Sequence, residues 1–225
     1  MKFDYVALAK MFDHAFLRPT ETDDVMEAGC RQAREYGVAS VCIKPYGVRL
    51  CADVLAGSDV LTSTVIGFPH GSNLTDIKLA EIDAAIEDGA EELDVVVNVG
   101  KVLQGDWDFV EADIGAMTEL CHESGKLIKV IFENCYLDDE RKVQLCKLCT
   151  EIGVDFVKTS TGFGTGGATV DDVKLMRANC PDHIRVKASG GVKTLDDLLA
   201  MREAGAARVG SSSTFAILDD VKARG

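Results

Sequence analysis

The chain is poor in aromatic residues, proline and histidine. It has one tryptophan and four prolines, and no proline- or serine-rich linker interrupts it. Without such a linker or a low-complexity segment, we expect residues 1–225 to form a single domain. The four histidines, at positions 14, 70, 122 and 183, are scattered without the spacing of metal ligands, so we expect no metal site.

Long apolar runs are also missing. No stretch approaches the length of a membrane span, and the opening MKFDYVALAK has no hydrophobic segment like that of a signal peptide. We therefore expect a cytoplasmic protein whose eight cysteines are free thiols. Cys146 and Cys149 form a C-x-x-C, but it lies within a predicted helix and has no second copy. We interpret both as packing residues.

Positive charge is scarce, because the formal net charge is -13. A field of this sign repels polyanions, so nucleic acid and anionic membranes are not expected as partners. A small phosphorylated molecule is still compatible with the sequence. Helix N-termini and backbone N–H groups can bind a phosphate without any net positive charge.

Short apolar runs alternate with amphipathic stretches along the whole chain. Buried strands are predicted at 38–43, 60–66, 91–98, 126–132, 154–158, 184–188 and 206–210, with an eighth around 11–15. Helices are predicted at 22–36, 45–56, 74–89, 106–124, 138–152, 170–178, 194–204 and 212–222. Eight strand–helix units of this length predict an α/β fold, the (β/α)8 TIM barrel. The alternative is a doubly wound sheet, but its GxGxxG turn is absent.

Four charged residues interrupt the predicted strands where a packing role would favour valine or isoleucine. They are Asp94, Lys129, Lys158 and Lys187. Each alone reads as a solvated rim residue or a cap. Together they would converge on one mouth of a barrel, because the carboxyl ends of its strands meet there and form the active sites of such folds.

Two lysines beside a carboxylate suit carbon–carbon bond chemistry through an imine. A free lysine has a pKa of about 10.4, so very little neutral amine exists at neutral pH. A second ammonium nearby lowers that pKa and produces the nucleophile. Lys158 is our candidate nucleophile, Lys187 the neighbouring cation, and Asp94 the group that moves a proton at the reacting carbon.

Glycine-rich segments follow the last three predicted strands. STGFGTGGAT (160–169) contains Thr161 and Gly162, SGG (189–191) contains Gly191, and GSSS (210–213) contains Gly210, Ser211 and Ser212. Glycine lets the backbone approach an anion, and the loops after strands seven and eight often bind phosphate in barrels. These residues are our candidates for substrate and phosphate binding.

With these segments the chain resembles the deoxyribose-phosphate aldolase family over nearly its whole length. The matching stretches are TVIGFPHGSN, EELDVVVNVGKVLQGDW, LIKVIFENCYLDD, DFVKTSTGFGTGGAT, RVKASGGVKT and ARVGSSS. The resemblance implies a (β/α)8 barrel without metal or cofactor. It also implies an aldehyde-lyase that reversibly splits 2-deoxy-D-ribose 5-phosphate into acetaldehyde and D-glyceraldehyde 3-phosphate. Barrel enzymes of this kind are often homodimers, although no interface signature is visible here.

By the same resemblance, Lys158 is the Schiff-base lysine, Lys187 the second lysine and Asp94 the proton-relay acid. Asp13, Lys129 and Cys42 are expected to support the site, and Asp13 would orient Lys129 or a substrate hydroxyl. One position departs from the family pattern, because its early DHT motif reads Asp13-His14-Ala15 here. The missing hydroxyl leaves two alternatives open: an imine-forming aldolase for another phosphosugar, or a non-catalytic phosphosugar-binding barrel.

Overall fold

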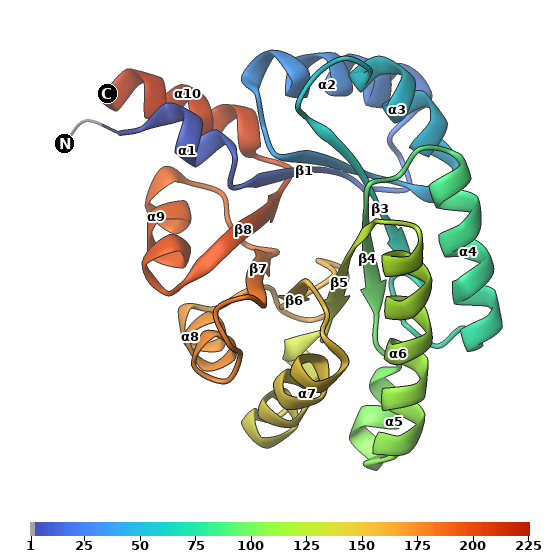
Figure 1. Ribbon diagram of the computed structural model, residues 1–225. Helices are drawn as coiled ribbons and strands as arrows, with labels where there is room; N and C mark the ends of the chain where they lie inside the picture. Colours follow the sequence, from blue (N-terminus) through green and yellow to red (C-terminus); the bar gives the residue numbers. More distant parts are fainter. Residues whose placement is uncertain (1–2) are drawn as a thin grey trace.

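Eight parallel strands close into a barrel ringed by helices in the computed structural model, which describes residues 3–225 (Figure 1). Each strand pairs with the next in sequence, and the last pairs with the first. The strands are β1 (Phe12–Phe16), β2 (Ser40–Ile43), β3 (Leu61–Ile66), β4 (Glu92–Val96), β5 (Leu127–Ile131), β6 (Phe156–Lys158), β7 (Arg185–Ser189) and β8 (Ala206–Ser211). The predicted (β/α)8 fold is therefore confirmed.

Helices connect the strands and cover the outside of the barrel. They are α1 (Tyr5–Ala9), α2 (Asp23–Tyr36), α3 (Val48–Leu55), α4 (Thr75–Glu87), α5 (Val99–Gln104), α6 (Trp107–Glu123), α7 (Asp139–Ile152), α8 (Val170–Ala178), α9 (Leu195–Glu203) and α10 (Thr214–Arg224). Two short 3-10 helices, η1 (Pro45–Gly47) and η2 (Asn134–Tyr136), precede α3 and α7. The first and last helices are neighbours, since α1 packs beside α10 (Figure 1).

The sequence analysis did not predict α1 and α5, because these short helices are defined by side-chain caps rather than by hydrophobic periodicity. The Asn98 side chain accepts a hydrogen bond from the Lys101 backbone N–H, at 3.2 Å, and starts α5. The strand expected over 91–98 consequently ends at Val96. Asp4 caps α1 in the same way through the N–H of Ala7, at 3.1 Å. The helix expected over 45–56 is divided into η1 and α3.

Successive side chains of a strand alternate between the inside of the barrel and the layer between the strands and the helices. On β4, Leu93 and Val95 face outward and join the hydrophobic cluster between strands and helices. Glu92 and Asp94, on the opposite side of the same strand, are fully buried inside the barrel. Phe156 fills the space near them, with the guanidinium of Arg208 5.4 Å from its ring centre. The apolar outer layer holds the barrel together, and the inner layer is free to carry charge.

The structure also describes the cysteines. Cys146 and Cys149 are buried in α7 as free thiols, and they pack there as predicted.

Across residues 3–225, the helices are too short or too polar to span a bilayer.

A buried ion pair ties α4 to α6 outside the barrel. The Lys78 ammonium lies 2.7 Å from a carboxylate oxygen of Asp113, and the two side chains are 0% and 2% exposed. Lys78 also donates to the carbonyl of Val96 at the end of β4, at 3.1 Å, and Asp113 accepts a bond from Thr75 at 2.7 Å. The pair therefore fixes two helices and one strand end in a single arrangement.

We expect Asp113→Ala to lower the free energy of unfolding by about 3–5 kcal/mol, because it leaves the Lys78 ammonium buried without a counter-ion. Replacing both partners, as Lys78→Met with Asp113→Leu, should restore most of that loss. Asp59→Ala is the control, since its ion pair with Lys10 is mostly exposed and should contribute about 0–1 kcal/mol. Urea denaturation followed by circular dichroism measures all three. Equal losses for Asp113→Ala and Asp59→Ala would contradict this account.

Candidate active site

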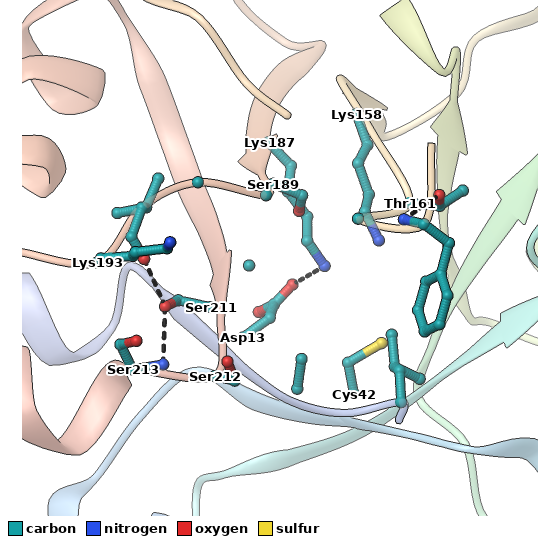
Figure 2. A pocket seen from close by; sticks show the side chains of 18 of the residues that line it. Asp13, Cys42, Lys158, Thr161, Lys187, Ser189, Lys193, Ser211, Ser212 and Ser213 are labelled. Carbon is teal, nitrogen blue, oxygen red and sulfur yellow. Dashed lines mark hydrogen bonds and ion pairs between the residues drawn. The ribbon is translucent and has the colours of Figure 1, made fainter. Parts of the chain in front are cut away.

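A pocket of about 420 Å³ opens at the carboxyl ends of the strands (Figure 2). Ten of the residues predicted from the sequence line it: Asp13, Cys42, Lys158, Thr161, Gly162, Lys187, Gly191, Gly210, Ser211 and Ser212. The other two predicted residues, Asp94 and Lys129, are fully buried and contact the lining residues from within the barrel. The structure therefore brings the whole predicted set to one place.

The two lysines of β6 and β7 meet at a single carboxylate oxygen. Lys158 and Lys187 are register partners on adjacent strands. The Nζ atom of each lies 2.6 Å from Oδ2 of Asp94. Since both contacts share one oxygen, the two nitrogens are at most about 5.2 Å apart, within the roughly 4–6 Å over which like charges shift each other's pKa. Lys158 and Lys187 both point into the pocket (Figure 2).

Burial lowers the pKa of Lys158, and the neighbouring Lys187 ammonium lowers it further, while Asp94 acts in the opposite direction. From the sequence, we expected the second cation to be the main cause of the lowered pKa of Lys158. Removal of the amine from water is instead the larger cause. The direction of the pKa shift is as predicted, and it favours the neutral amine that attacks a carbonyl.

Lys187 has the opposite tendency although it is equally buried. Burial disfavours its charge, but Asp13 and Asp94 outweigh burial and raise its pKa. The pKa of Asp94 is lowered despite burial, because Lys129, Lys158 and Lys187 surround it. The site therefore holds one lysine whose pKa is lowered and one whose pKa is raised, with an ionised carboxylate between them.

Asp13 and Lys129 form the layer that supports these groups. Lys129 lies 3.0 Å from Asp13, so Asp13 does contact the lysine it was expected to orient. Lys129 is also 3.0 Å from Oδ1 of Asp94, although that contact is not aligned as a hydrogen bond. Asp13 further contacts Lys187, and it accepts a bond from the hydroxyl of Ser40 at 2.7 Å.

Two further charges complete this layer, and the sequence analysis missed both. Arg208 on β8 contacts Asp13 and lies 3.1 Å from Glu92 on β4. Glu92 is in turn 2.6 Å from Lys129. In sequence, Glu92 stands at the start of a strand and Arg208 lies near a strand end, and such positions usually face solvent. The signal that could have found them is their spacing: Glu92 lies two residues before Asp94, and Arg208 two residues before Gly210. Residues two apart on a strand point to the same side.

The central charge cluster consists of these seven ionisable residues, each at most 9% exposed: Asp13, Glu92, Asp94, Lys129, Lys158, Lys187 and Arg208. Three are acids and four are bases. If all were ionised the cluster would carry one excess positive charge in a poorly solvated interior, which is costly. Loss of the proton from Lys158 makes the count equal.

Two side chains of β1 and β2 complete the wall around the lysines. Ala15 lies two residues beyond Asp13 on the same strand and lines the pocket without a polar atom. Cys42 is buried, with its sulfur 4.0 Å from Asp94, and burial raises the pKa of its thiol. Cys42 therefore presents a neutral thiol beside the lysines.

The other end of the pocket is built from loops after β7 and β8. The Ser211 hydroxyl donates to the carbonyl of Val192 at 2.8 Å and accepts from the Ser213 N–H at 3.0 Å, so it joins the two loops. α10 begins directly after Ser213, which lines this end of the pocket. Arg18 adds an exposed cation to the lining, and Lys193, which the sequence analysis did not single out, adds another (Figure 2).

Glycine is required at position 210, where this end meets the lysines. A Cβ atom there would lie 2.3 Å from the Ser189 hydroxyl and 3.4 Å from Cε of Lys187. Any other residue would push Lys187 or the β7 loop away. The loop end of the pocket thus lies directly beside Lys187, an arrangement with room for a ligand that has a carbonyl at one end and a phosphate at the other.

Comparison with known proteins agrees with this geometry. Residues 6–218 match the family model described as DeoC/LacD family aldolase. The deoxyribose-phosphate aldolase of Rhodopirellula baltica is 53% identical over 220 residues, which cover 98% of this chain and 91% of that protein. The enzyme of the same name from Thermococcus gammatolerans is 46% identical over 217 residues and 96% of both chains.

Solved structures agree as well. The deoxyribose phosphate aldolase of Aeropyrum pernix, described as having a unique tetrameric structure, is 30% identical. It superposes with a TM-score of 0.89 over 97% of this chain and 92% of that one. The resemblance seen in the sequence is therefore confirmed, and the chain belongs to the DeoC/LacD family of aldolases, which are carbon–carbon lyases.

Proposed function

We propose that this chain reversibly cleaves 2-deoxy-D-ribose 5-phosphate to acetaldehyde and D-glyceraldehyde 3-phosphate through a Schiff base on Lys158. The observation that carries the proposal is the contact of Lys158 and Lys187 with one oxygen of Asp94 inside the pocket. A pure binding protein gains nothing from a buried amine with a lowered pKa. An aldolase needs that amine as its nucleophile.

In the proposed reaction, neutral Lys158 attacks C1 of the open-chain sugar, and loss of water gives an imine. The protonated imine accepts the electron pair of the C2–C3 bond as that bond breaks, and the C3 hydroxyl loses its proton to a base. Asp94, directly or through water, is the carboxylate placed to take that proton. The products of this step are glyceraldehyde 3-phosphate and an enamine on Lys158.

The second half of the cycle returns the proton. The enamine carbon that was C2 is protonated, water adds to the imine, and acetaldehyde leaves Lys158. Lys187, whose pKa is raised by Asp13 and Asp94, is the ammonium that can donate to this carbon or polarise the bound oxygen. The phosphate would lie against Gly191, Gly210, Ser212 and the start of α10, with Lys193 and Arg18 at the rim.

Reductive trapping tests the nucleophile. Incubation with acetaldehyde and borohydride should add one ethyl group, and peptide mapping should place it on Lys158. Lys158→Ala should abolish both trapping and turnover, with an unchanged circular dichroism spectrum. An adduct on another lysine, or the absence of any adduct, would sink the proposed mechanism. Tight binding of the sugar phosphate without trapping or turnover would support the non-catalytic alternative.

The pH dependence of trapping tests the role of Lys187. Since the neutral amine reacts, the rate should fall as pH decreases through the pKa of Lys158, which lies below the usual lysine value. Lys187→Met removes a repelling cation and leaves Asp94 shared by fewer partners, and both changes raise that pKa. We expect the midpoint of the trapping rate to rise by about one pH unit.

The control for this experiment is Lys126→Met. Lys126 lies just before β5, at the end of the barrel away from the mouth, and pairs with the half-exposed Glu91. Its variant should trap acetaldehyde with the wild-type midpoint. A midpoint in Lys187→Met that stays constant or moves to lower pH would show that the second lysine does not set the pKa of the first.

The substrate preference depends on the β1 wall, where Ala15 leaves out the hydroxyl of the family's DHT motif. Ala15→Thr should lower KM for 2-deoxyribose 5-phosphate about two- to tenfold, the effect of one added hydrogen bond of about 0.5–1.5 kcal/mol. Initial rates with 2-deoxyribose 5-phosphate, ribose 5-phosphate and fructose 6-phosphate would measure this. A wild-type preference for another sugar would favour the second candidate, an imine-forming aldolase for that phosphosugar.

The expected cytoplasmic location and homodimer stay predictions. The Aeropyrum pernix relative is described as tetrameric, so assemblies larger than a dimer are also candidates. Light scattering of the purified chain determines the number of copies.

A further inference from the structure

Glu133 has an unusual backbone conformation directly above the catalytic strands. It follows β5 with φ 57° and ψ 61°, and within residues 3–225 it is the one non-glycine residue at positive φ. Side chains with a Cβ rarely adopt this left-handed region. The side chain is nevertheless buried, with 3% of its surface exposed. Such a conformation persists when surrounding contacts enforce it, and these outliers cluster at functional sites.

The closest side-chain contacts of Glu133 are with the loop that follows β6. Its two carboxyl oxygens accept from the Thr161 backbone N–H at 3.2 and 3.3 Å, and one of them also accepts from the Thr161 hydroxyl. That hydroxyl in turn accepts from the N–H of Phe163 at 3.0 Å. A chain of hydrogen bonds therefore runs from Glu133 through Thr161 to Phe163, and both of these loop residues line the pocket.

The loop also packs directly on Glu133. A Cβ added at Gly164 would lie 3.2 Å from the Glu133 carboxyl carbon and 2.8 Å from the sulfur of Cys135. Phe163 extends the same loop to the far wall, where its ring meets that of Phe68 edge to face at 5.4 Å. The loop that leaves the Schiff-base strand β6 is thus held at its base by one carboxyl group.

We propose that Glu133 is a positioning residue that anchors the 161–166 loop, so that Thr161 and Gly162 face the phosphorylated part of the substrate. The proposal rests on the proposed aldolase function for its substrate. Glu133 touches neither catalytic lysine, so its loss should weaken substrate binding without changing imine formation. In its left-handed backbone conformation, the carboxyl group accepts hydrogen bonds from both the N–H and the hydroxyl of Thr161.

Glu133→Gln tests the anchor, because a carboxamide keeps one acceptor and turns the other into a donor. We expect KM for 2-deoxyribose 5-phosphate to rise about tenfold, while kcat and the rate of acetaldehyde trapping on Lys158 stay within about twofold. A role in overall folding alone would instead lower the apparent kcat and the extent of trapping and leave KM unchanged. Asp138→Asn is the matched control. It also replaces a carboxylate with a carboxamide in the segment between β5 and α7, but at the exposed N-cap of α7.

Glu133→Gly separates the anchor from the backbone. Glycine adopts positive φ freely but supplies no acceptor. If Glu133 is an anchor, the glycine variant shows at least the KM increase of Glu133→Gln. A glycine variant with the wild-type KM would overturn the proposal.

Hydrogen exchange tests the anchor without relying on catalysis. In the ligand-free protein, the peptide covering 159–166 should exchange about tenfold faster in Glu133→Gln than in the wild type or Asp138→Asn. Unchanged exchange would overturn the inference even if the wild type is an aldolase. Faster exchange in a chain that neither traps acetaldehyde nor cleaves the sugar would support the anchor and refute the proposed function.

Discussion

The arrangement of the pocket depends on an unequal number of basic and acidic side chains buried inside the barrel. Four bases and three acids share the barrel interior, and the ordinary protonation states leave one positive charge too many. Electrostatics in a poorly solvated interior penalise such an excess strongly. Lys158 is the one lysine of the cluster whose pKa is lowered, while those of Lys129 and Lys187 are raised. Burial and the neighbouring Lys187 ammonium lower the pKa of Lys158, whereas Asp13 and Asp94 raise the pKa values of the other two lysines.

The sheet supplies the precision this arrangement needs. Register pairs Asp94 with Lys129, and Lys158 with Lys187, so the groups are held by backbone hydrogen bonds on rigid strands. Loops form the other end of the pocket, where the Ser211 hydroxyl joins the loops after β7 and β8. Placing reacting groups on strands avoids the loss of rate that follows when they are misplaced by about 1 Å.

The sequence predicted the architecture well because the alternation of strand and helix patterns is a local signal. It also identified the lysines and Asp94, since a charge inside an apolar run is conspicuous. Glu92 and Arg208 were missed because they stand near strand ends, and their burial follows from barrel closure. Glu133 was missed for a related reason: its conformation is set by contacts with a loop 28 residues away. Position in the chain predicts the strand, but only the closed barrel shows which end residues face inward.

The contact between Asp13 and Arg208 joins the first strand to the last across 195 residues. A growing chain lacks this guanidinium until residue 208 has been added. Until then β1 has no β8 beside it, and the Asp13 carboxylate cannot enter the interior with its counter-ions complete. Closure of the barrel therefore follows synthesis of β8, and a chain released before that point retains two unpaired strand edges.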